Sequence, residues 1–158
     1  MATQEQSSSL DAKKLSLVTD ESIELLKQLI PIPSFSKEEN VTADLLQKFL
    51  KSKGVTPFRM MNNVWARNKY YKDGLPTILL NSHHDTVKPN SGYTKNPFEA
   101  IVEDGKLFGL GSNDAGGCLV SLLAAFMYFY DKENMPYNFV FAASAEEEIS
   151  GLNGIELI

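Results

Sequence analysis

Hydrophobic and polar positions divide the chain into a polar start followed by amphipathic and apolar segments. Residues 1–17 are polar and rich in serine, and we expect them to form a flexible tail. Behind them, apolar side chains in 23–30 recur at helical spacing, with Thr19 or Asp20 available as the N-cap. This pattern predicts a helix that begins close to residue 19.

A second helix is predicted after an interrupting Pro-Ile-Pro. Ser36 and Glu39 have the spacing of a capping box, and Gly54 suits the end of that helix. Two segments of β-type composition follow, 55–60 and 63–71, with asparagine at their join. Together they indicate a hairpin or close antiparallel neighbours.

Two apolar runs, 77–82 and 137–144, are typical of buried strands, and an apolar helix is predicted between them over 114–132. The stretch 89–111 is predicted to be a loop. Helices that alternate with apolar strands favour an α/β fold with a mixed, partly parallel sheet layered between helices. We therefore expect one domain over 18–158, with ligand sites at the carboxyl ends of its strands.

Composition narrows the classes of partner. The chain has 158 residues and is 43% hydrophobic, which is enough for one core. Its net charge of -5 argues against a nucleic-acid groove or an anionic membrane surface as partner. The single cysteine, Cys118, fits a reducing compartment, and no secretory signal or membrane-spanning run is present. We expect a cytoplasmic protein.

The two histidines of the chain stand together at the end of the first apolar run. In an extended strand, His83 and Asp85 point to one face and His84 to the other. Neutral imidazole binds metals, and a nearby carboxylate can orient the ring. A strand-end histidine held in a polar loop would show the same pattern, so this motif alone leaves metal binding open.

Two acidic clusters follow. Asp114 lies among glycines, where it could approach a ligand or simply cap the next helix. Glu146, Glu147 and Glu148 come directly after the second apolar run. Such a run is usually a solvated helix start, but packed carboxylates repel unless a cation neutralises them or one takes up a proton. With His83, these clusters offer the mixed nitrogen and oxygen ligands that zinc or cobalt accepts.

The ordered motifs "SHHDTV", "GLGSNDAGG" and "SAEEEISGLNG" resemble those of the co-catalytic metallopeptidase family that includes acetylornithine deacetylase, succinyl-diaminopimelate desuccinylase, aminoacylase and carboxypeptidase G. The resemblance runs from about residue 18 to the last residue. In the second and third motifs, the chain looks most like acetylornithine deacetylase. It implies that the chain is the N-terminal part of a larger catalytic domain, with a lid and dimerisation domain beyond it.

The resemblance also implies a role for each motif residue. His83 resembles a ligand of the first metal, and Asp85 resembles the carboxylate that orients it. Asp114 resembles the aspartate that bridges two metals, and the peptide after it is expected to be cis. Glu147 resembles the general base and Glu148 a ligand of the second metal, although a slip of one residue would exchange these two roles. The implied cofactors are two zinc ions, with cobalt as an alternative.

The implied reaction is hydrolysis of the amide bond of a small-molecule N-acyl amino acid, with deacylation of N-acetyl- or N-succinyl-ornithine in arginine biosynthesis as the first candidate. The alternatives are a succinyl-diaminopimelate desuccinylase or dipeptidase of the same family, or a truncated non-catalytic scaffold. The full-length form is expected to be a homodimer. The 158-residue chain alone is expected to be inactive, because the family's remaining metal ligands lie further along. Gly116 stands where many members have lysine.

Overall fold

The computed structural model describes residues 2–158, with side chains from Ser9 onward. It contains three α-helices, six strands and three short helical turns. In chain order these are α1 (Ala2–Leu29), α2 (Asn40–Ser52), β1 (Pro57–Met60), β2 (Asn63–Arg67), β3 (Thr77–His83), β4 (Ile101–Glu103), β5 (Lys106–Phe108), η1 (Ser112–Gly117), α3 (Cys118–Phe129), β6 (Asn138–Ser144), η2 (Glu147–Ile149) and η3 (Ile155–Leu157).

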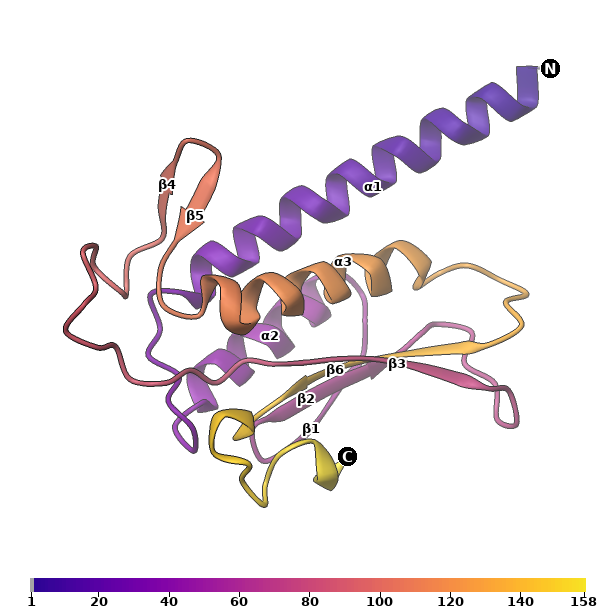
Figure 1. Ribbon diagram of the computed structural model, residues 1–158. Coiled ribbons are helices and arrows are strands. Elements are labelled where there is room, and N and C mark those ends of the chain that lie inside the picture. The colour runs from indigo at the N-terminus through magenta and orange to yellow at the C-terminus, as the bar shows by residue number, and fades with distance from the viewer. Residues whose placement is uncertain (1) are drawn as a thin grey trace.

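Four of the strands form one mixed sheet in the order β1–β2–β6–β3 (Figure 1). β1 pairs with β2, and β2 with β6, in antiparallel fashion, whereas β3 runs parallel to β6. The predicted α/β fold with a partly parallel sheet is therefore confirmed. Because β3 and β6 are parallel and His83 pairs with Ser144, the two strands end side by side at one edge of the sheet.

All three helices cover the same face of that sheet (Figure 1). Alternate residues of the central strands, such as Phe141, point into a core shared with Leu25, Leu46 and Phe126 of the three helices. The opposite face carries no helix within residues 2–158. The expected cover by helices on both sides is thus present on one side only. No helix of this part of the chain is both long and apolar enough to cross a membrane.

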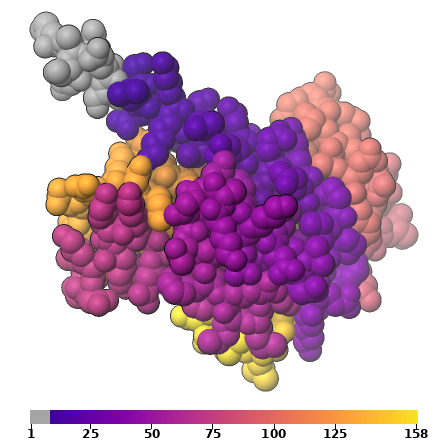
Figure 2. Space-filling model, turned by 180° about the vertical axis from the view of Figure 1, so that it is seen from behind, coloured from indigo at the N-terminus to yellow at the C-terminus, as the bar shows by residue number. Residues whose placement is uncertain are grey.

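Helix α1 begins far before the cap predicted at Thr19 or Asp20. It runs from Ala2, so most of the segment predicted as a tail is helical; its flexibility stays a prediction. Lys14 donates to Asp131 just after α3, which ties this part of α1 to the body. In Figure 2, the molecule is seen from behind, with α1 along the upper border and α2 in the middle of the face.

The predicted capping box is wrong. Glu39 is the residue before α2, but no side chain caps that helix. The hydroxyl of Ser36 donates instead to Asp85, at 2.7 Å, and the Glu39 carboxylate accepts hydrogen bonds from other parts of the chain. Both side chains are therefore used in tertiary contacts, which outweigh the local alternative.

Two further predictions need correction. The loop predicted over 89–111 contains the β4–β5 hairpin, whose turn residues Asp104 and Gly105 both have positive φ. Strand β3 was expected to be buried, but it lies at the edge of the sheet, and Leu79 is 52% exposed. Only its last residues, next to the carboxyl edge, are buried.

Candidate metal centre

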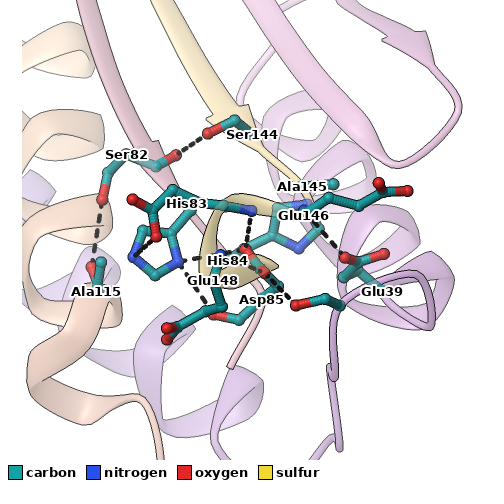
Figure 3. Close-up of polar contacts among 12 residues, drawn as sticks. Glu39, Ser82, His83, His84, Asp85, Ala115, Ser144, Ala145, Glu146 and Glu148 are labelled. Carbon is teal, nitrogen blue, oxygen red and sulfur yellow. Dashed lines mark hydrogen bonds and ion pairs between the residues drawn. The ribbon is translucent and has the colours of Figure 1, made fainter. Parts of the chain in front are cut away.

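The carboxyl edge of the sheet brings the three predicted clusters together. His83 ends β3, Asp114 lies in η1 before α3, and Glu148 lies in η2 just after β6. One ligand atom from each of these side chains lies within 4.8 Å of the others. Figure 3 shows His83 and Glu148 converging from their separate segments. Parallel pairing of β3 with β6 is what places them side by side.

The His83 ring is oriented with one nitrogen toward this cluster. Its Nδ1 lies 3.1 Å from the Asp85 carbonyl oxygen and 3.3 Å from Asp85 Oδ1, and its Nε2 lies 3.2 Å from Asp114 Oδ1. The hydrogen bond to the Asp85 side chain is the main reason that the pKa of His83 rises to about 9, against the opposing effect of burial. Nε2 is thus the nitrogen available to a metal, which would displace its proton.

Asp85 does more than orient this ring. It is 1% exposed and accepts from the Ser36 hydroxyl at 2.7 Å and from the backbone amides of Glu147 and Glu148 at 3.2 and 3.1 Å. Burial acts to raise the pKa of Asp85, but the hydrogen bonds from His83, Ser36 and the two amides outweigh it and hold the pKa at about 2. One buried carboxylate therefore fixes both the histidine and the turn that carries the glutamates.

The remaining acidic side chains crowd the open side of the cluster. Glu147 Oε2 lies 3.5 Å from His83 Nε2, and the Asp114 side chain is 76% exposed. Burial, and then the nearby Asp114 carboxylate, raise the pKa of Glu148. An imidazole nitrogen among several carboxylates is a ligand set that fits zinc, and a cation would relieve their mutual repulsion.

Glu146 is placed differently from its two neighbours. Its side chain is buried and accepts from the side-chain amide of Asn153 at 2.9 Å. Its backbone has φ of 54°, in the left-handed region that few residues other than glycine adopt. Of the three glutamates, Glu147 and Glu148 lie at the cluster. Their arrangement fits the chosen register, while their roles as base and ligand stay predictions.

His84 points away from His83, as the strand alternation predicts. It is buried, and burial lowers its pKa. Its ring nitrogens lie 2.9 Å from the Thr42 hydroxyl and 2.9 Å from the Asn62 carbonyl. Sequence reasoning did not find this polar network behind the cluster. The Asp114–Ala115 peptide is cis, as expected.

The sequence profile of peptidase family M20/M25/M40 matches residues 79–158, which is 80 of the 158 residues and includes every predicted site residue. The chain therefore belongs to peptidase family M20/M25/M40, and it shows the α/β fold and the clustered histidine and acidic side chains described above.

Curated relatives include succinyl-diaminopimelate desuccinylases. The enzyme of Buchnera aphidicola subsp. Cinara cedri is 33% identical over 143 residues, covering 86% of this chain and 37% of that protein. The enzyme of Beijerinckia indica subsp. indica is 26% identical over 149 residues, covering 87% and 38%. This chain thus spans a little over a third of the length of these relatives.

Solved structures share the fold. Human carnosine dipeptidase 1 superposes with a TM-score of 0.69 at 19% identity, covering 91% of this chain and 36% of that one. A dinuclear metal-binding peptidase of the M20 family from Bacillus subtilis gives a TM-score of 0.64 at 19% identity, covering 88% and 38%. At these identities, the likeness establishes the fold.

Proposed function

We propose that this chain is the metal-binding part of a hydrolase that cleaves the amide bond of an N-acyl amino acid. The observation that carries the proposal is the convergence of His83, Asp114 and Glu148 within 4.8 Å at the carboxyl edge of the sheet. Asp85 stands behind them, buried and fully used in hydrogen bonds. Packing alone does not require imidazole and carboxylates to meet there.

The proposed cofactors are two zinc ions, with cobalt as the alternative. His83 and Asp114 would hold the first, and Asp114 and Glu148 the second. The name of the Bacillus subtilis neighbour, a dinuclear metal-binding peptidase, supports two ions. When bound, such ions supply Lewis acidity and lower the pKa of a water molecule.

Glu147 is the proposed general base. Its side chain is largely exposed, and its Oε2 lies beside His83 Nε2, so it faces the side from which substrate and water would arrive. There it would accept a proton from the attacking water and donate it to the leaving amine. Asp85 would hold His83 in the orientation that keeps Nε2 directed toward the cluster.

Two substrates are proposed. The residues of the second and third motifs resemble those of acetylornithine deacetylase, which favours an N-acyl-ornithine that carries an acetyl or succinyl group. The names of the curated relatives favour N-succinyl-diaminopimelate instead. The test is to assay the native protein from its source cells on both compounds. The compound with the higher kcat/KM is the preferred substrate. A cytoplasmic location and a homodimeric full-length form are proposed with it, on composition and on the family resemblance.

The metal site is tested by titrating the purified chain with Co²⁺ and following its absorption. We expect Asp114→Asn to raise the Co²⁺ dissociation constant by at least about tenfold, because a ligand is lost. Asp104→Asn is the matched control, since Asp104 sits on the distant β4–β5 turn with positive φ that asparagine also accepts. Equal affinity in the two variants, or no binding by the wild type, would refute the proposal.

A further inference from the structure

Four successive backbone amides, from Ala145 to Glu148, each donate to a side chain. The acceptors are Asn63 Oδ1 at 3.0 Å, Glu39 Oε1 at 3.1 Å, Asp85 Oδ1 at 3.2 Å and Asp85 Oδ2 at 3.1 Å. This segment, which we call the 145–148 turn, carries the proposed base and one proposed ligand. Its position is set amide by amide from outside the turn.

Two members of this set, Asn63 and Glu39, have no role in the chemistry described so far, and Glu39 is the acidic one of the two. It is 0% exposed, and its carboxylate accepts from Lys37 N at 2.7 Å, from Asn62 Nδ2 at 2.8 Å and from Glu146 N at 3.1 Å. Figure 3 shows it at the start of α2, reaching toward Glu146. Burying a carboxylate is costly unless it is hydrogen-bonded, and here three donors supply the bonds.

The amide that Glu39 holds belongs to the strained residue of the turn. Glu146 has φ of 54°, a left-handed conformation that is unfavourable for a residue other than glycine. Its own carboxylate is turned away to Asn153, so it cannot hold the turn toward the metal cluster. The contact with Glu39 fixes this residue just before the chain reaches Glu147 and Glu148.

We propose that Glu39 is a positioning residue, which sets the 145–148 turn so that Glu148 and Glu147 face His83. The inference rests on the proposed function for the meaning of that geometry. Glu39 itself does not touch the cluster. It acts through the Glu146 amide, and it links the start of α2 and the β1–β2 hairpin to the turn.

The hydrogen-bond pattern offers a polarity swap as the test. In Glu39→Gln, the oxygen that accepts from Glu146 can stay, but the new amide NH₂ then faces the NH₂ of Asn62. Asn62→Asp in the same chain replaces that NH₂ with an acceptor, and its other oxygen can still accept from Arg59, which donates to Asn62 Oδ1 at 3.1 Å. The double variant thus restores complementary partners.

Two quantities are measured in the wild type, Glu39→Gln and the double variant: the Co²⁺ dissociation constant and the hydrogen exchange rates of the Ala145–Glu148 amides, by NMR. We expect Glu39→Gln to weaken Co²⁺ binding by about tenfold or more, in the range found for residues that support metal ligands. Exchange of the Glu146 amide should accelerate by a similar factor. Both should return toward wild-type values in the double variant.

Asn138→Ala is the control for general destabilisation. Asn138 is buried at the opposite end of β6, where it bonds to Lys72 and not to the turn. Loss of Co²⁺ affinity to the same degree in this variant, or unchanged exchange and affinity in Glu39→Gln, would overturn the inference, as would a loss that the double variant does not restore. Exchange rates need no metal, so a wild type that binds no Co²⁺ would refute the proposed function while the amides still decide the role of Glu39.

Discussion

At the scale of single residues, Asp85 connects several parts of the site through hydrogen bonds. It accepts hydrogen bonds from a ring, a hydroxyl and two backbone amides while being almost completely buried. Each of its oxygens faces donors only. A neutral side chain of the same shape cannot satisfy all of them, because one of its two polar atoms is itself a donor.

Asp85→Asn should therefore cost stability and metal affinity together. A buried donor left without a partner costs about 1–3 kcal/mol, so the urea midpoint should fall. Co²⁺ affinity should drop by about 10–100-fold, because His83 and the 145–148 turn lose their common support. Asp131→Asn is the control: this exposed residue pairs with Lys14, and such surface pairs contribute about 0–1 kcal/mol. Equal midpoints for the two variants would contradict the assignment.

The site residues that could be predicted from the sequence are those that belong to a short local pattern. His83 and Asp85 are two apart at the end of an apolar run, and the glutamates follow another such run. The prediction that Glu39 caps a helix is wrong because two of its three partners are distant in sequence, the Glu146 amide by 107 positions. No local pattern records a bond of that span. The sequence also does not show that Glu146 points away from Glu147 and Glu148, because this depends on the left-handed backbone conformation of Glu146.

At the scale of elements, the packing of α1 against η1 depends on Gly116. A Cβ at this position would lie 2.5 Å from the Gly111 carbonyl oxygen and 2.5 Å from Leu26 Cδ1. The first contact is with backbone and cannot be relieved by a side-chain rotation. This close approach explains in physical terms why the chain has glycine at this position.

Gly116→Ala should accordingly destabilise the chain. Overpacking of this kind typically costs about 1–3 kcal/mol, which urea unfolding followed by circular dichroism would detect. Gly92→Ala is the matched control, because its Cβ would approach only the exposed Asn90 side chain, at 3.0 Å, and its effect should be within about 0.5 kcal/mol. The explanation fails if both substitutions shift the midpoint alike.

Elements with strong periodicity were predicted well. The apolar runs predicted β3, α3 and β6, and the asparagines between two β-type segments predicted the β1–β2 hairpin. The β4–β5 hairpin was missed although Asp104–Gly105 is a hairpin signal, because its strands have only three residues each. The first half of α1 was missed because its serine-rich sequence lacks an apolar stripe, which is the feature that periodicity detects.

At the scale of the whole molecule, the sheet has two unlike faces. The helices cover one face. The other, which we call the far face, carries the side chains of Phe58, Met60, Trp65, Leu79 and Val140. Phe58 and Trp65 stack there with ring centroids 5.6 Å apart. The free edge of β3 adjoins it. Arg67, which pairs with Val140, lies on the same face, with its guanidinium 5.7 Å from the centroid of the Phe58 ring. Exposed apolar side chains beside the edge strand of a sheet favour association.

We expect the purified chain to self-associate through this far face. Adding charge with Met60→Lys and Leu79→Lys should lower the weight-average mass in sedimentation velocity at high protein concentration. The matched control adds the same charge elsewhere, with Val41→Lys and Val102→Lys, which replace exposed apolar residues on α2 and β4. If both pairs reduce association equally, net charge and not the far face is responsible.

The parallel pairing of β3 with β6 has a consequence for how the chain acquires its structure. The two strands are separated by a hairpin and a helix, so their pairing must pay the entropy of closing a long loop. The proposed metal ligands His83 and Glu148 meet only when that loop is closed. An ion bound there stabilises the closed state by mass action, by about 2.7 kcal/mol at a concentration 100-fold above its dissociation constant. We therefore expect the metal supply to govern how much of the chain is folded.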